Sequence, residues 1–305
     1  MRKIKKKDIE RLEWIHSNRV TSASSFKKRF FPEYTDQGVH RILKYYVQNK
    51  LLLSIEPQSR KYPWFWSLSE EGIKVLVDKK VYLGTHTRPI KIGYGEPEHH
   101  SNVVDLRVAF ETNPDLEPWE YSGAGDTFSG KVFFVTDYEL NKGIKPRDKW
   151  NYLIETPDDQ KEAFFQNWKN ELKLKNQKTL QEIAAGQEKK RIKSRRPDGF
   201  FWALWEGKKR PFVLEYEHAI YTPSHLEEVI KILKIEYSYT TEYRDGTTEK
   251  APIKLFICRS PARVENLKKQ ILGLLKDEEP ENLWMISDLE TVKTLPIKTA
   301  FQVVI

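Results

Sequence analysis

The sequence predicts a two-domain protein of mixed helix and strand content, and three patterns support this. The first 80 residues carry short amphipathic helical stretches and two short strand-like runs. Residues 81–97 lack periodicity and contain proline and glycine, as linkers do. From residue 98 to 305, apolar strand-like runs and helical patterns indicate a mixed sheet covered by helices. The fold class is therefore α+β or α/β, and the length suffices for two hydrophobic cores.

Residues 1–80 are expected to form three helices, a hairpin and a closing helix. Apolar residues recur at helical spacing in the first and third helices, and Thr21 or Ser22 is a suitable cap for the second. The elements are expected at 6–16, after 22, from 36, at 51–55, at 62–68 and from 69. This order is typical of a winged helix-turn-helix.

Such a domain uses its third helix to enter the major groove of DNA. We therefore expect Gln37, His40, Arg41 and Lys44 to lie near bases or phosphates. Arg60 and Lys61, at the tip of the hairpin, would contact the DNA backbone or minor groove. The alternative is a domain used only for protein–protein contact, with these charges as a solvated face.

Composition favours a polyanionic partner such as double-stranded DNA. The formal net charge is +8 and the sequence pI about 9.2. Cys258 is the one cysteine, which excludes an intramolecular disulfide and a Cys-based zinc site and fits a cytoplasmic location. The basic N-terminus is not followed by an apolar segment, and no apolar run is long enough to span a bilayer. A homodimer is considered because winged-helix proteins often pair on palindromic sites.

The second domain is expected to begin with a helix rich in valine, leucine and phenylalanine. A charged helical insertion is expected around 158–195, either as a solvated hairpin or as an arm that follows phosphates. Strands are expected at 118–121, 131–135, 195–201, 211–217, 252–258 and 283–287, with helices from 98, 222 and 260. The run 131–135 could equally belong to an insertion. The polar turn 206–210 is expected to join the third and fourth of these strands.

Acidic residues stand at the ends of that hairpin. Asp198 stands at the start of its first strand, and Glu215 and Glu217 end its second strand on one face, since strand side chains alternate. Clustered carboxylates need a cation or a solvated cleft. We therefore expect these three to bind Mg²⁺ or Mn²⁺, with Glu111 or Asp105 of the first helix as a further carboxylate. The metal would activate a water for phosphodiester hydrolysis.

Pro197-Asp198 and Glu215-Tyr216-Glu217, in an α-β-β-β-α-β order, resemble the PD-(D/E)XK nuclease superfamily. Glu217 stands where that motif has lysine, so Lys231 or Lys234 of the following helix is expected to replace it. The series from His100 to Arg107, then 196–199, then 214–217, resembles the replication-relaxation family. That resemblance implies an N-terminal winged helix, a nuclease-like domain, and DNA binding in plasmid or mobile-element replication or mobilisation.

Three functions remain open from the sequence. The first is a metal-dependent DNA endonuclease, and the second is a non-catalytic DNA-binding regulator or replication accessory factor with a degenerate nuclease fold. The third is a partner-binding scaffold without a nucleic-acid role. Asp198 also suits a turn, and the two glutamates could pair with arginines of the basic helix. Zinc binding by histidines is a weaker hypothesis than surface or capping positions, and it concerns His99, His100, His218 and His225.

Overall fold

The computed structural model contains helices and a mixed sheet, which confirms the α+β class. It describes residues 4–56, 64–79, 81, 96–141, 146–164, 166–167, 170, 174, 196–217, 220–236, 241–242, 248–249, 251–275 and 283–304. None of the helices in these ranges has the length and apolar character needed to cross a membrane. Most of the charged stretch 158–195, the hairpin tip with Arg60 and Lys61, and His218 lie outside the described residues.

The N-terminal unit has the element order that the sequence predicts, with one additional short strand. Its elements are α1 (Lys6–Ser17), β1 (Thr21–Ser22), α2 (Ala23–Phe30), α3 (Asp36–Gln48), β2 (Leu52–Ile55), β3 (Phe65–Leu68) and α4 (Glu70–Asp78). The strands form an antiparallel sheet in the order β1-β3-β2. Side-chain oxygens of Ser22, Thr35 and Ser69 cap α2, α3 and α4 by accepting backbone N–H groups.

The second unit is built on a six-stranded sheet in the order β13-β12-β11-β8-β7-β6. The strands are β6 (Val132–Thr136), β7 (Gly199–Trp205), β8 (Lys208–Glu217), β11 (Ile253–Cys258), β12 (Trp284–Asp288) and β13 (Gln302–Val303). β6, β7 and β8 are antiparallel, and β11 lies parallel to both β8 and β12. Two small antiparallel pairs lie outside this sheet: β4 (Trp119–Ser122) with β5 (Thr127–Gly130), and β9 (Thr241–Glu242) with β10 (Thr248–Glu249).

Helices cover both faces of the six-stranded sheet. α9 (Pro223–Glu236) and α10 (Pro261–Leu274) pack on one face, over an apolar cluster that includes Phe200, Val213 and Trp284. α5 (Glu96–Thr112), α11 (Leu289–Thr294) and α12 (Ile297–Ala300) pack on the other face. The short helices α6 (Asp137–Asn141) and α7 (Pro146–Trp150) follow β6, and a π-helical turn spans Asn151–Glu155.

The turn between β7 and β8 is shorter than predicted. Glu206 and Gly207 alone connect the strands, with φ values of 52° and 72°. Two consecutive left-handed residues form the tight hairpin turn that matches strand twist, and glycine at the second position is the residue this conformation favours. The remaining residues of the predicted turn therefore pair within the sheet.

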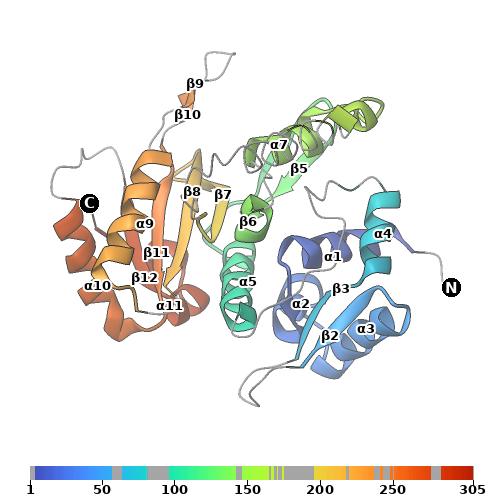
Figure 1. The fold of residues 1–305 in the computed structure, drawn as a ribbon, viewed down its shortest axis with the longest axis horizontal. Coiled ribbons are helices and arrows are strands. Elements are labelled where there is room, and N and C mark those ends of the chain that lie inside the picture. Colours follow the sequence, from blue (N-terminus) through green and yellow to red (C-terminus); the bar gives the residue numbers. More distant parts are fainter. Residues whose placement is uncertain are drawn as a thin grey trace, which may run out of the picture.

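α5 belongs to both hydrophobic cores. Val104 and Val108 pack into the N-terminal core, whereas Leu106 and Phe110 pack over the sheet. The helix begins at Glu96, inside the predicted linker, and Figure 1 shows it between the N-terminal unit and the six-stranded sheet. Arg107 of α5 donates to Ser17 Oγ and Asn18 Oδ1 at 2.8 and 3.1 Å. This helix therefore joins the two units rather than starting only the second.

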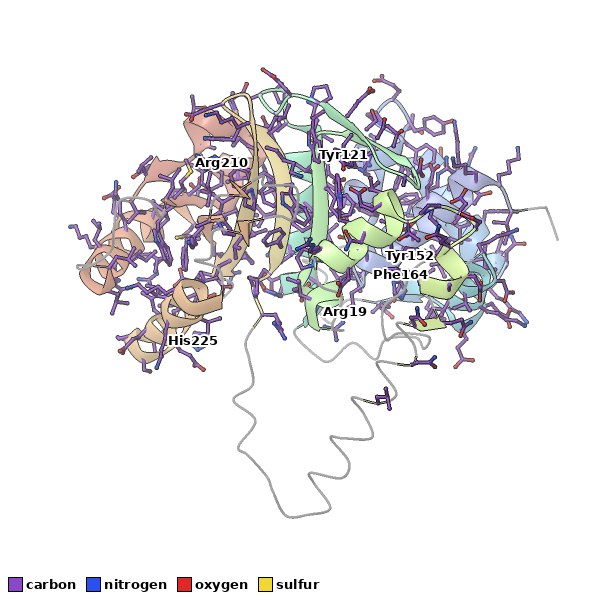
Figure 2. All side chains as sticks on the ribbon, turned by 90° about the horizontal axis from the view of Figure 1, so that it is seen from above. Arg19, Tyr121, Tyr152, Phe164, Arg210 and His225 are labelled. Atoms are coloured by element: carbon purple, nitrogen blue, oxygen red, sulfur yellow. The ribbon has the colours of Figure 1, made fainter. Side chains whose placement is uncertain are left out.

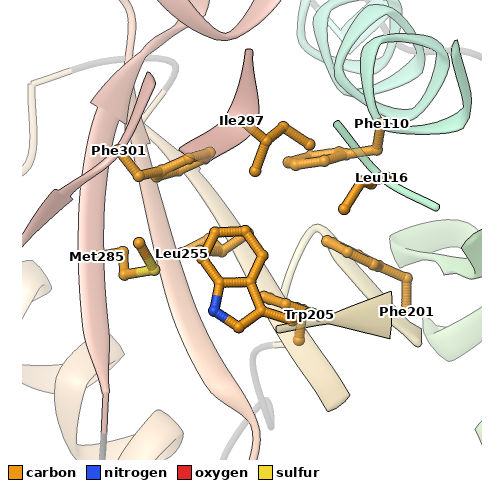
Figure 3. Close-up of a pocket in the computed structure, with 9 residues that line it drawn as sticks. Phe110, Leu116, Phe201, Trp205, Leu255, Met285, Ile297 and Phe301 are labelled. Carbon is orange, nitrogen blue, oxygen red and sulfur yellow. The ribbon is translucent and has the colours of Figure 1, made fainter. Parts of the chain in front are cut away.

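A cavity of about 10 Å³ lies between the sheet and the helices on the α5 face. Apolar side chains line it, among them Phe110, Phe201 and Trp205 (Figure 3). A space of this size holds at most one water, and its lining offers that water no polar partner. We therefore interpret it as a packing defect and not as a ligand site.

Candidate functional site

Three acidic residues occupy one row at an edge of the six-stranded sheet. Gly199 of β7 pairs with Thr136 of β6 and with Leu214 of β8. The next row along this register therefore contains Asp137, Asp198 and Glu215, which are 9%, 7% and 2% exposed. The backbone N–H of Asp137 donates to the carbonyl of Asp198 at 3.0 Å, so the pairing extends to this row. Antiparallel strands thus place the end of β6 beside the start of β7.

Asp198 is held on both carboxylate oxygens. Its Oδ2 accepts the backbone N–H of Tyr216 at 2.7 Å, and its Oδ1 lies 3.0 Å from His99 Nε2. The imidazole of His99 also stacks on the Tyr216 ring, with centroids 5.9 Å apart. Burial lowers the pKa of His99, but the hydrogen bond and charge of Asp198, with the charges of Asp137 and Glu215, outweigh it. The pKa of His99 is therefore raised above its ordinary value, which favours an imidazolium paired with Asp198.

The neighbouring His100 has the opposite electrostatics. Burial, together with the positive charges of Arg19 and His99, lowers the pKa of His100 to about 3. Its Nδ1 lies 3.6 Å from Asp137 Oδ2, and its Nε2 contacts the guanidinium of Arg19. Arg19 follows α1, so this contact connects the N-terminal unit to the acidic row. His100 is therefore a neutral acceptor at physiological pH.

His99, His100 and Asp137 offer ligand atoms that all lie within 4.8 Å of one another. Two imidazoles and a carboxylate are donors that a transition metal such as zinc accepts, whereas magnesium prefers oxygen ligands. The group could therefore hold a metal, although its donor set is not that of a magnesium site. His100 is 5% exposed, so its predicted surface or capping position is wrong. His225 lies away from Arg19 (Figure 2). It belongs to α9, and its ring contacts the Tyr221 ring.

Glu217 does not share an open cation site with Asp198. Its two oxygens accept three contacts of 3.0–3.2 Å from Nε and Nη2 of Arg263, at the start of α10. The backbone N–H of Tyr221 also donates to Glu217 at 3.0 Å, and the Tyr221 hydroxyl donates to Glu215 Oε1 at 2.6 Å. An arginine pairs with one glutamate, as the sequence allowed, but it belongs to α10 and not to the basic stretch. The structure thus corrects the assignment of Glu217 as a metal ligand.

The other predicted site residues lie elsewhere. Glu111 pairs with Arg29 at 2.6 Å and with Arg107 at 2.8 Å, and it lies about 18 Å along α5 from His99 at 1.5 Å per residue. Lys234 Nζ lies 3.5 Å from the carbonyl of Leu274, which ends α10.

Arg263 marks the opposite end of α10 from Leu274, about 16 Å away along the helix axis. Lys234 therefore lies far from the pair of Glu217 and Arg263, which contradicts its predicted catalytic role. Lys231 is exposed on α9. Asp105, the alternative fourth carboxylate, pairs with Lys293 at 3.1 Å and accepts from Ser25 at 2.6 Å.

Comparisons with family models, with curated proteins and with solved structures found no match. The candidate site therefore rests on the geometry of this chain alone.

Several residues of the site were missed from the sequence. Asp137 follows the apolar run of β6, whereas Asp198 precedes the apolar run of β7. The antiparallel pairing of these two strands brings both aspartates into one row, and that pairing was not predicted. Arg263 and Tyr221 carried no local signal, since their contacts with the glutamates depend on how helices close over the sheet. Outside this row, Lys254 of β11 is fully buried beside Val213, with its ammonium 5.6 Å from the Trp284 ring centroid.

The predicted DNA-contact residues on α3 that the structure describes share one side of the helix. Gln37, His40, Arg41 and Lys44 are exposed. Val39, Leu43 and Tyr46, on the opposite side, are at most 1% exposed and pack into the N-terminal core. The His40 ring meets the Trp66 ring of β3 edge-on at 5.6 Å. α3 is therefore anchored through one side and presents polar groups on the other.

Proposed function

We propose that this protein binds double-stranded DNA through α3 and acts in plasmid or mobile-element replication or mobilisation without cutting the DNA. The observation that carries the proposal is the polar side of α3, where Gln37, His40, Arg41 and Lys44 are exposed together. These residue types hydrogen-bond base edges and phosphates, and a helix with one anchored side fits the major groove.

The order of elements supports a winged-helix domain in the N-terminal unit. α3 follows α2 after a short turn, and the β2–β3 hairpin follows α3. In a winged helix this arrangement gives the third helix a rigid support and provides a wing that reaches the DNA backbone. A net charge of +8 favours association with a polyanion, because opposite charges attract over long range.

We infer that the second unit has a nuclease-like fold that lacks part of the catalytic motif. Its elements α5, β6, β7, β8, α9 and β11 follow the order that the resemblance to PD-(D/E)XK nucleases implies, with short elements inserted between them. Glu217 stands where the motif has lysine and is held by Arg263, so it provides no cation to a scissile phosphate. We therefore assign DNA binding to the N-terminal unit and no hydrolysis to the second unit.

Fluorescence anisotropy with a labelled duplex tests DNA binding. The double variant R41A/K44A should lose at least ten-fold in affinity, since each base or phosphate contact contributes about 1–3 kcal/mol. The matched control is K208Q/K269Q, which removes two exposed charges from the second unit. Salt-insensitive binding by the natural protein, or equal losses in the two variants, would contradict the proposal.

Metal-dependent cleavage is the second candidate, and the acidic row with its two histidines favours it. Asp137, Asp198 and Glu215 provide the oxygen ligands that Mg²⁺ or Mn²⁺ accepts, whereas Glu217 does not fit because Arg263 occupies its oxygens. A metal bound there would supply an activated water. His99, paired with Asp198 at 3.0 Å, would hold that ligand in position.

Incubation of supercoiled plasmid with Mg²⁺ or Mn²⁺ distinguishes the two candidates. We expect no nicking from the natural protein. The variant D198N keeps an acceptor for the Tyr216 N–H, so it tests charge with little change of structure. Nicking by the natural protein that D198N abolishes would establish the enzyme and overturn the binding-only proposal. The cytoplasmic location and a homodimer on a palindromic site remain proposals, and sedimentation with and without the duplex tests the dimer.

A further inference from the structure

A basic groove of about 400 Å³ lies between the start of α1 and α3. Among the described residues, four cationic side chains and one carboxylate line it, together with an isoleucine and two tyrosines: Lys5, Lys7, Asp8, Arg11, Arg41, Ile42, Tyr45 and Tyr46. Lys5, Lys7 and Arg41 are exposed, and Tyr45 is 37% exposed. The groove therefore concentrates positive charge at a concave, solvent-accessible surface.

The one carboxylate in the groove is already satisfied. Asp8 accepts from the Tyr46 hydroxyl at 2.8 Å, from Arg11 at 3.2 Å and from the Lys5 backbone N–H at 3.0 Å. These contacts fix Arg11, whose guanidinium also lies 4.6 Å from the centroid of the Phe31 ring. The charges of Lys5, Lys7 and Arg41 thus remain the net charge that the groove presents to a ligand.

The position of the groove relative to α3 identifies the ligand. At 100° per residue, His40 and Tyr45 lie on opposite flanks of the polar side of α3. His40 contacts β3 of the hairpin, whereas Tyr45 lines the groove. A helix in the major groove has a phosphate backbone on each flank. The hairpin therefore faces one strand of a duplex, and the groove faces the other.

We propose that this groove binds consecutive backbone phosphates of the duplex strand opposite the β2–β3 hairpin, with Lys5 and Lys7 as phosphate contacts. The inference rests on the proposed insertion of α3 into the major groove. It adds a contact that sets the orientation of α3 and carries no sequence information, because phosphates are alike at every base pair.

The test measures anisotropy of labelled duplexes between 0.05 and 0.3 M salt for the natural protein and for K5Q/K7Q. Each phosphate contact contributes about 0.9 to the slope of log K against log salt, so the variant should lose about 1.8 in slope. At about 0.15 M salt this corresponds to a loss of about 30-fold in affinity. The loss should be the same for duplexes of different sequence.

K208Q/K269Q, with the same change of charge, is the control and should keep the slope of the natural protein to within a few tenths. If the natural protein binds the duplex and K5Q/K7Q keeps its slope, the groove proposal is wrong and α3 binding stands. If the natural protein does not bind the duplex, the proposed function itself fails. An equal loss on a single strand of the same length would show that the groove follows single-stranded DNA, which contradicts the assignment to a flanking duplex strand.

Discussion

The ion pair between Glu217 and Arg263 leads to a quantitative prediction about stability. The Glu217 side chain is 2% exposed and that of Arg263 is 12% exposed, and three nitrogen–oxygen contacts of 3.0–3.2 Å join them. Replacing Arg263 with methionine removes the cation and leaves a buried carboxylate. Such a loss typically costs about 3–5 kcal/mol. Because the Tyr221 N–H still donates to Glu217, we expect about 3 kcal/mol.

Urea denaturation followed by tryptophan fluorescence measures this cost, and thermal unfolding should show a Tm lower by about 6–12 °C. The matched control is R259M, because Arg259 pairs with Glu98 at 3.4 Å through a side chain that is 61% exposed. That exposed pair should contribute less than about 1 kcal/mol. The double variant E217Q/R263M should recover part of the loss, since it removes both charges. A cost for R263M no larger than that for R259M would refute the reasoning.

The remaining predictions concern the histidines and Gly199. Because the pKa of His100 is lowered to about 3 in the folded protein, protonation of this residue opposes folding below about pH 6.5. Between pH 7.5 and pH 5, the free energy of unfolding should therefore fall by about 2 kcal/mol more in the natural protein than in H100Q. His99 faces Asp198, Asp137, Glu215 and His100, and its pKa is raised in the folded protein. Its protonation therefore stabilises the fold below about pH 6.5, and this contribution is lost as the pH rises through the folded pKa. Between pH 6.5 and pH 8, the free energy of unfolding measured in urea should fall less in H99Q than in the natural protein. A Cβ on Gly199 would lie 2.6 Å from Phe134 Cζ, so G199A should cost about 1–3 kcal/mol in urea, whereas G273A, whose Cβ meets no atom within 4 Å, should be neutral or stabilising. Equal effects of the two glycine changes would refute that packing argument.

The sequence by itself determined the order of the longer elements, whereas short ones such as β1, β13 and α12 were not predicted. Period-3.6 apolar spacing predicted α1 and α3, and apolar runs bounded by polar turns predicted β6, β7, β8, β11 and β12. These signals are local, because a helix or strand must place its apolar residues toward one core whatever the neighbour is. Local polarity alone also assigned residues 208–210 to the turn after β7, although they pair in β8 and the turn consists of Glu206 and Gly207.

The tertiary structure decided the partners of the charged groups. The sequence grouped Asp198, Glu215 and Glu217 as one cation site, but Arg263 of α10 neutralises Glu217, and His99 and Asp137 join Asp198. Glu111 likewise pairs with arginines at the far end of α5. Glu217 and Arg263 meet because α10 packs against the sheet, and they are 46 positions apart in the sequence. Apolar periodicity reports which residues face a core, but it does not report which distant charged residues come into contact. If R263M had the same free energy of unfolding as the natural protein, the assignment of Glu217 to Arg263 instead of a cation would lose its support.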